Sequence, residues 1–270
     1  MTFADILAAV ATLGDAVGEG LVALALGFAA LPTGIGFLIG AVLVFALGSV
    51  IPVSFEVESL TVISRLGQRD WKRMAYMVLL AGILGACFGI LGVYGHIVSF
   101  IDGPILAGMM TGVGVILSFV AIDTFKGNKV VGGVSIAAAL LVFFGLSGND
   151  NNLIYALFIS VLAGVIASRF VPFEAIETST EREKFRLIPF DGFAWLKDIR
   201  IIRGALALLA LRVGTSIAYS GIDGQMAGVD VNVDHTNIIA GLAGAGSALF
   251  GGAPVEPIIS GTAAAPNPAI

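Results

Sequence analysis

Apolar segments long enough to cross a bilayer recur along the whole chain. The clearest occupy residues 72–94, 104–122, 129–147, 152–170, 203–222 and 236–252. A helix needs about 20 consecutive apolar residues to cross a hydrocarbon core of about 30 Å. Hydrophobic residues make up 57% of the chain and charged residues only 12%, whereas soluble domains carry about 25% charged residues. The sequence therefore predicts an all-α polytopic protein of the inner or plasma membrane.

The segments outside these clear spans are weaker. Residues 3–17 have a helical pattern interrupted by Asp5 and Asp15, so we expect an N-terminal helix that packs against the protein or lies at the membrane interface rather than a full span. Two apolar stretches then follow, and Pro32 is expected to break the helix between them. Residues 171–202 are polar with interspersed aromatics, which predicts an interfacial amphipathic connection. With the weaker segments counted, the chain is expected to hold nine to ten spans.

Two apolar segments are interrupted, near residues 52–64 and 253–268. The first starts at Pro52 and runs into a short apolar helix, and in the second four prolines after Gly251-Gly252 exclude a continuous helix. Irregular backbone at membrane depth is tolerated only where protein buries it or where it lines a cavity. The runs 46–53 and 248–255 share an Ala-Leu start and a Pro-Val end, and a glutamate follows each. Paired interrupted segments of this kind predict an inverted-repeat transporter with its site between them.

The charged residues are segregated along the chain. Every basic residue except Arg212 lies in three connections, and the alternating connections carry only acidic residues, which places the basic loops in the cytoplasm. Charges left at membrane depth are functional candidates because each is costly to bury: Glu56, Glu58, Arg212 and Glu256. Glu58 could instead cap the half-helix that follows it. Arg212 could contact a ligand directly or pair with Glu56 or Glu256.

Several classes of function have no support in the sequence. His96 and His235 lack metal-ligand spacing, and the single Cys87 lies in an apolar run. No glycine loop sits between a strand and a helix to bind phosphate, and no Ser-His-Asp set shares one compartment. No basic aromatic surface exists for nucleic acid. We therefore expect no enzyme activity, no cofactor, no bound metal and no nucleic-acid partner.

The order of these features resembles the nucleobase–cation symporters of the xanthine/uracil permease type. The matching stretches are Leu47 to Ser59, Gly103-Pro104 with the glycines that follow, Val213-Gly214-Thr215, and Phe250 to Thr262. The resemblance implies two inverted repeats of seven spans. It assigns residues 1–94 and 203–270 to a core domain, 95–170 to half of a gate domain, and 171–202 to their connection. It also implies that the chain is C-terminally truncated, since four more spans would follow.

The resemblance also implies a proton-coupled site for a nucleobase such as a purine, uracil or xanthine. The residues at matching positions are Phe55, Glu56, Arg212, Thr215, Tyr219, Val255, Glu256 and Ser260, with Glu256 and Glu56 as the carboxylates that would carry the proton. The implied partners are the solute, the proton, the bilayer and a second copy in a homodimer. Two alternatives remain: an anion carrier of the sulfate-permease type, favoured by the cationic Arg212, and a membrane scaffold or fragment that does not transport.

Overall fold

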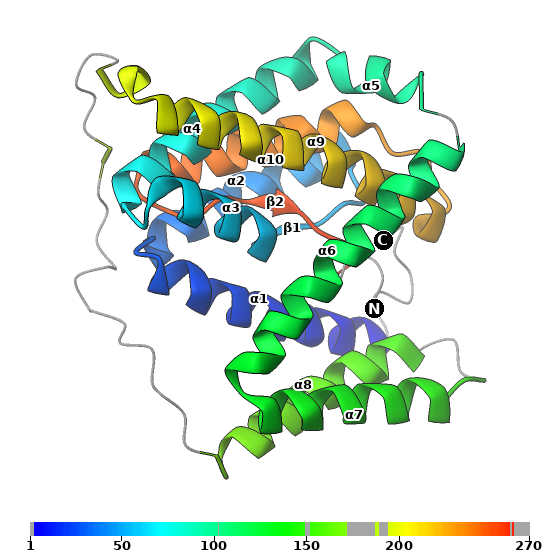
Figure 1. Ribbon diagram of the computed structural model, residues 1–270. Helices are drawn as coiled ribbons and strands as arrows, with labels where there is room; N and C mark the ends of the chain where they lie inside the picture. Colours follow the sequence, from blue (N-terminus) through cyan, green and yellow to red (C-terminus); the bar gives the residue numbers. More distant parts are fainter. Residues whose placement is uncertain are drawn as a thin grey trace.

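The computed structural model describes residues 3–101, 103–148, 152–171, 187–188, 194–259 and 261. Over these residues the chain is mostly helical, with one small sheet near the centre of the helices (Figure 1). The helices are α1 (Phe3–Ala25), α2 (Ala30–Leu47), α3 (Val57–Gly67), α4 (Trp71–Ile90), α5 (Val93–Val98), α6 (Gly103–Gly127), α7 (Lys129–Gly145), α8 (Asn152–Ser168), the 3-10 helix η2 (Ala194–Lys197), α9 (Ile199–Ala227) and α10 (Val233–Leu249). The strands are β1 (Val53–Ser54) and β2 (Glu256–Pro257).

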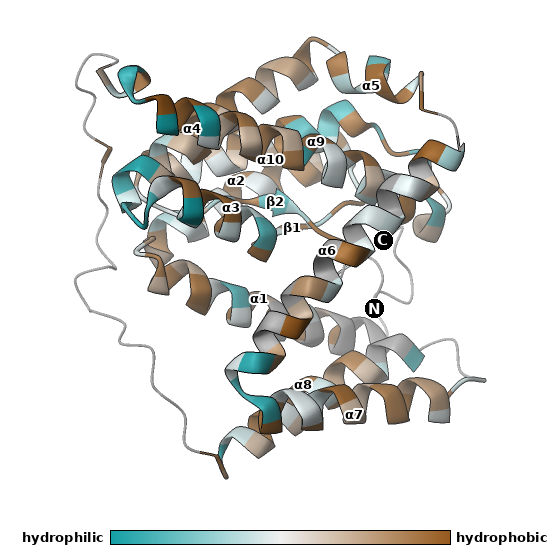
Figure 2. Cartoon of the chain, viewed as in Figure 1, coloured by the Kyte–Doolittle hydropathy of each residue, from teal (hydrophilic) through white to brown (hydrophobic). Residues whose placement is uncertain are grey.

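Three of the described helices are long and apolar enough to cross a membrane: α2, α4 and α9. The apolar helices α7 and α8 are shorter, and Figure 2 shows hydrophobic residues along both. Large apolar side chains such as Phe45 and Leu141 are exposed, as suits a surface that meets lipid rather than water. The chain is thus a multi-pass membrane protein. The expected number of nine to ten spans stays a prediction.

The first 50 residues differ from the sequence prediction in where the helix breaks. Residues 3–17 are not a separate lead, because α1 continues without interruption to Ala25. The chain turns at Gly27, whose φ of 95° suits glycine. Pro32 then lies in the first turn of α2, where a backbone N–H would have no acceptor within the helix and proline is tolerated. The predicted break at Pro32 is therefore wrong.

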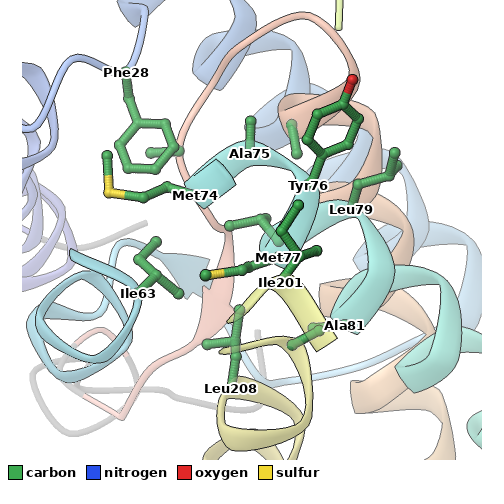
Figure 3. Packing of buried hydrophobic residues seen from close by; sticks show 14 of the residues in the cluster. Phe28, Ile63, Met74, Ala75, Tyr76, Met77, Leu79, Ala81, Ile201 and Leu208 are labelled. Carbon is green, nitrogen blue, oxygen red and sulfur yellow. The ribbon is translucent and has the colours of Figure 1, made fainter. Parts of the chain in front are cut away.

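Helix α4 lies at the centre of the packed helices and contacts α3, α9 and α10. Figure 3 shows its buried methionines, Met74 and Met77, among side chains from the neighbouring helices. Against α10 its backbone comes close: a Cβ added at Gly82 would lie 2.6 Å from the carbonyl oxygen of Gly241. Small residues allow such close approach between membrane helices, where lipid gives no hydrophobic drive to associate.

The segment between α10 and β2 is held against the start of α2. The Ala253 amide donates to Thr33 Oγ1 at 2.9 Å, and the Ser247 hydroxyl donates to the Ala253 carbonyl at 2.6 Å. The Ala29 amide donates to the Gly251 carbonyl at 2.9 Å. These bonds satisfy backbone groups that an interrupted helix leaves open. They also direct β2 into the centre of the molecule.

Candidate functional site

The candidate site is built on the crossing of the two interrupted segments. β1 and β2 pair antiparallel, with Val53 opposite Pro257 and Ser54 opposite Glu256. The Ile258 amide extends the ladder by donating to the Pro52 carbonyl at 3.0 Å. Figure 1 shows the pair among α2, α3, α9 and α10. The two runs matched in the sequence therefore end side by side, as expected for paired discontinuous spans.

Successive side chains of the strands point to opposite faces. Val53 and Val255 pack toward α2, since a Cβ added at Gly40 would lie 2.6 Å from Val53 Cγ2, and one at Gly36 would lie 3.0 Å from Val255 Cγ2. Phe55 falls on the same face by its position in the alternation. Of the predicted site residues, Phe55 and Val255 thus lie on the α2 face, away from the carboxylates.

Phe55 lines an apolar pocket between α1 and α2. The pocket has a volume of about 350 Å³. Its aromatic lining includes Phe28, Phe37 and Phe55, and the rings of Phe37 and Phe55 meet edge to face with centroids 4.9 Å apart. The remaining lining residues are mostly aliphatic. Such a pocket can accept the face of a flat or apolar group, but its lining offers few polar partners.

On the opposite face, Glu256 forms a bidentate ion pair with Arg212 of α9. Arg212 Nε lies 2.7 Å from Glu256 Oε2 and Nη2 lies 2.5 Å from Oε1, and both side chains are fully buried. Arg212 Nη1 also donates to the Ala81 carbonyl of α4 at 3.3 Å. Of the two carboxylates considered from the sequence, Glu256 is therefore the partner of Arg212. Planar two-bond pairing of this type is strong and directional.

Glu56 shares this face but is only partly satisfied. It follows β1 as the N-cap of α3, in an extended conformation, and is 3% exposed. The Ser59 hydroxyl donates to its Oε2, and Oε1 has no hydrogen-bond partner among the described residues. Tyr219 of α9, also buried, is close enough to Glu56 to interact electrostatically. A buried carboxyl oxygen without a donor is unusual in a folded protein, and Glu58 Oε1, two residues further on, is in the same state among the described residues.

The other predicted residues have different roles or positions. The Thr215 hydroxyl donates to the Arg212 carbonyl at 3.4 Å, so it is used within its own helix. Glu58 lies in the first turn of α3, where a negative charge favours the helix N-terminus, and its Oε1 has no hydrogen-bond partner among the described residues. Ser260 lies outside the described residues. The structure therefore brings together Glu56, Arg212, Tyr219 and Glu256 from the predicted set.

Sequence reasoning missed the polar contacts between α9 and α10. The Ser216 hydroxyl donates to Asn237 Oδ1 at 3.1 Å, and the hydroxyls of Ser220 and Thr236 lie 3.2 Å apart. All four residues are buried. Hydrogen bonds of this kind link membrane helices. Polar residues recurring every four positions in the 203–222 span were the available signal, although their partners belong to another span.

A polar network holds the N-terminus of α9 outside the apolar segments. Asp198 caps α9 and accepts from the Arg200 amide at 3.0 Å, and its other oxygen lies 3.2 Å from Arg73 Nε of α4. The Arg200 amide, the Arg200 guanidinium and then Arg73 lower the pKa of Asp198 below its ordinary value. Arg200 also donates to Gln68 beyond the end of α3. These contacts fix the relative positions of the helices that surround the crossing.

The described residues contain no cluster of three or more histidines, cysteines or carboxylates able to hold a metal ion. No known family model matches the sequence, and no curated protein matches it. A solved structure does match in fold: the transmembrane domain of a cyanobacterium bicarbonate transporter, BicA, with a TM-score of 0.59 and 18% identity. The match covers 98% of this chain and 77% of the other. The chain therefore shares the fold of a transporter's transmembrane domain, and membership of the nucleobase–cation symporters stays a prediction.

Proposed function

We propose that this chain is part of a secondary transporter that carries a small polar solute past the β1–β2 crossing, with Glu56 as the group that takes up the coupling proton. The observation that carries the proposal is the buried Oε1 of Glu56, which has no hydrogen-bond partner among the described residues. It lies beside two crossed, interrupted helices, which is where transporters of inverted-repeat design bind their solute.

A structural explanation accounts poorly for Glu56. A carboxylate at membrane depth costs several kcal/mol unless it is paired. Glu256, on the same face, is a paired carboxylate, since it accepts two short hydrogen bonds from Arg212. Glu56 has one hydroxyl donor and no arginine. A proton or a solute N–H would satisfy it, and that difference supports a role in the transport cycle.

The charge at the crossing favours a neutral solute. Arg212 is compensated by Glu256, so ionised Glu56 leaves a net negative charge on that face. A nucleobase is a flat plate with donors on its edge, and it can donate to a carboxylate or accept from a protonated one. A nucleobase is therefore the leading candidate. In this proposal, residues 1–94 and 203–270 form a core domain that moves relative to the gate residues 95–170. Two copies of the chain would form a homodimer through the gate residues.

A small oxyanion is the second candidate, and one observation favours it. The solved structure of similar fold belongs to a protein described as a bicarbonate transporter. Its low identity makes this a likeness of fold rather than of site. With Arg212 bonded to Glu256, an oxyanion would meet a repulsive Glu56 unless a proton or a cation entered with it. The two candidates thus share the same coupling residue.

The test is competition binding on the purified protein with labelled uracil, xanthine, bicarbonate and sulfate. We expect uracil or xanthine to bind. Binding should be accompanied by release or uptake of a proton by the protein, measured as a pH change in weakly buffered solution. Glu56→Gln should abolish that proton exchange, whereas the control Asp198→Asn, which removes a paired carboxylate outside the apolar segments, should retain it. Binding of sulfate or bicarbonate alone would refute the nucleobase assignment. Unchanged proton exchange in Glu56→Gln would refute its coupling role.

A further inference from the structure

Another buried polar group without a hydrogen-bond partner lies near the Arg212–Glu256 ion pair. Tyr94 belongs to α5 and is fully buried, and its hydroxyl has no hydrogen-bond partner among the described residues. Burying a hydroxyl without a partner is unfavourable, and a phenylalanine would fill the same space without that penalty. The hydroxyl therefore needs an explanation other than packing.

Tyr94 points to the same place as Arg212. A Cβ added at Gly85 of α4 would lie 3.0 Å from Arg212 Nη1 and 3.6 Å from the Tyr94 hydroxyl oxygen. Gly85 thus leaves open the space that the guanidinium and the phenol share. The charges of Arg212, Glu256 and Asp234 all act on the Tyr94 hydroxyl, which places it within electrostatic range of the pair.

The position of Tyr94 is set from the opposite side by Asp234 of α10. Asp234 accepts from the Tyr94 amide through Oδ1 and from the Gly95 amide through Oδ2, both at 3.0 Å. A Cβ at Gly95 would lie 2.6 Å from Asp234 Oδ2, so the contact requires glycine there. Two charge-assisted bonds to consecutive amides hold the start of α5 against α10.

Arg212 has N–H groups that make no described hydrogen bond and could donate to the Tyr94 hydroxyl. A guanidinium carries five N–H groups, and the described contacts use one each on Nε, Nη1 and Nη2. The bond from Nη1 to Ala81, at 3.3 Å, is the longest of the three. While Glu256 is ionised, its two bonds are enough to hold the arginine. Once Glu256 is neutralised, Arg212 becomes a buried cation that lacks a counter-ion.

We propose that Tyr94 is a positioning residue for Arg212: its hydroxyl accepts from Nη1, directly or through one water molecule, when Glu256 no longer holds the guanidinium. This rests on the proposed function, because the transport cycle is what would loosen the pair through a proton or a solute at the crossing. While the Arg212–Glu256 pair is intact, the Tyr94 hydroxyl makes no hydrogen bond to Arg212. When the pair is loosened, the hydroxyl accepts from Arg212 and holds the guanidinium at its position beside α4.

The test is a thermodynamic cycle on the purified protein, read as thermal unfolding midpoints. Tyr94→Phe alone should unfold no earlier than the parent protein, because it removes an unsatisfied hydroxyl. In a Glu256→Gln background the same substitution should lower the midpoint by on the order of 5 °C, the loss of one hydrogen bond to a charged group. Tyr155→Phe, on α8, is the matched control and should have no effect in either background.

Two results would overturn the proposal: an earlier midpoint for Tyr94→Phe alone, or equal midpoints for Glu256→Gln with and without Tyr94→Phe. If Glu256→Gln does not fold, Glu256→Asp loosens the pair in its place. A second measurement uses whichever of labelled uracil, xanthine, bicarbonate or sulfate binds the parent protein. Tyr94→Phe should weaken that binding about tenfold, and unchanged affinity would contradict the proposal. If none binds, the proposed function fails while the cycle still decides the role of Tyr94.

Discussion

Neutralising Glu256 is the perturbation whose effect the structure predicts most directly. Glu256→Gln keeps the size of the side chain and one amide oxygen, but it removes the negative charge that faces Arg212. Both side chains are 0% exposed, so water cannot compensate the arginine that remains. Removing one partner of a buried ion pair typically costs about 3–5 kcal/mol. The retained amide oxygen places the expected loss at the lower end of that range.

The assay is thermal or denaturant unfolding in a fixed detergent. A loss of about 3 kcal/mol corresponds to a midpoint lower by roughly 6–12 °C for a chain of this size. Asp198→Asn is the control, since it removes a carboxylate from a partly exposed network and should cost less than about 1 kcal/mol. The two variants lose the same charge, and they differ in burial.

A combined replacement separates the pair from the packing around it. Arg212→Met with Glu256→Leu removes both charges and fills similar volume, so stability should return to about the parent level or exceed it. Solute binding should not return with it. A midpoint for Glu256→Gln within about 1 °C of the parent protein would refute the reasoning, because a fully buried and bidentate pair cannot be lost at so small a cost.

Three further outcomes follow from single contacts. Gly241→Ala should destabilise the protein by about 1–3 kcal/mol in denaturant unfolding, since its Cβ would lie 2.6 Å from the Gly82 carbonyl oxygen; an unchanged midpoint would show that α4 and α10 are further apart. Thr33→Val removes the acceptor of the buried Ala253 amide and should cost about 1–3 kcal/mol by the same measurement, with faster exchange of that amide in deuterium as the specific readout. The folded-state pKa of Asp198 lies below its ordinary value, so its stabilisation is complete above pH about 4 and is lost as pH falls through the lowered pKa. Asp198→Asn should reduce the loss of unfolding free energy at acidic pH. The same pH dependence in the variant and the parent protein would contradict the stabilising role of Asp198.

The sequence predicted most helices close to where they lie, because an apolar segment of sufficient length has few other options in a bilayer. The span expected at 72–94 corresponds to α4, and the one expected at 236–252 overlaps α10. The break near Pro32 was misplaced, because the effect of a proline depends on whether it lies in the first turn of a helix or in its middle. Helix starts are set by backbone partners, such as Ala29 with Gly251, that lie far apart in the sequence.

The site was predicted only in part, for the same reason. The matched runs, each ending in Pro-Val with a glutamate after it, pointed to both strands, and their alternation is a local property that any extended segment has. The register, with Ser54 opposite Glu256, is not local. It decides that Phe55 and Val255 face α2 while Glu56 and Glu256 share the other face. Tyr94 had no local signal, since its importance comes from Gly85 and Arg212 on other helices.

By itself the sequence determined the class of this protein: an apolar chain with two interrupted segments and a few charges at membrane depth, which composition and spacing are enough to specify. Only the tertiary structure decided which of those charged side chains pair with one another. Arg212 could have paired with either nearby carboxylate, and the crossing of β1 with β2 brings Glu256 to it and leaves one oxygen of Glu56 without a donor. The energy of a buried charge depends on distances of a few ångströms between distant parts of the chain, and folding alone sets those distances.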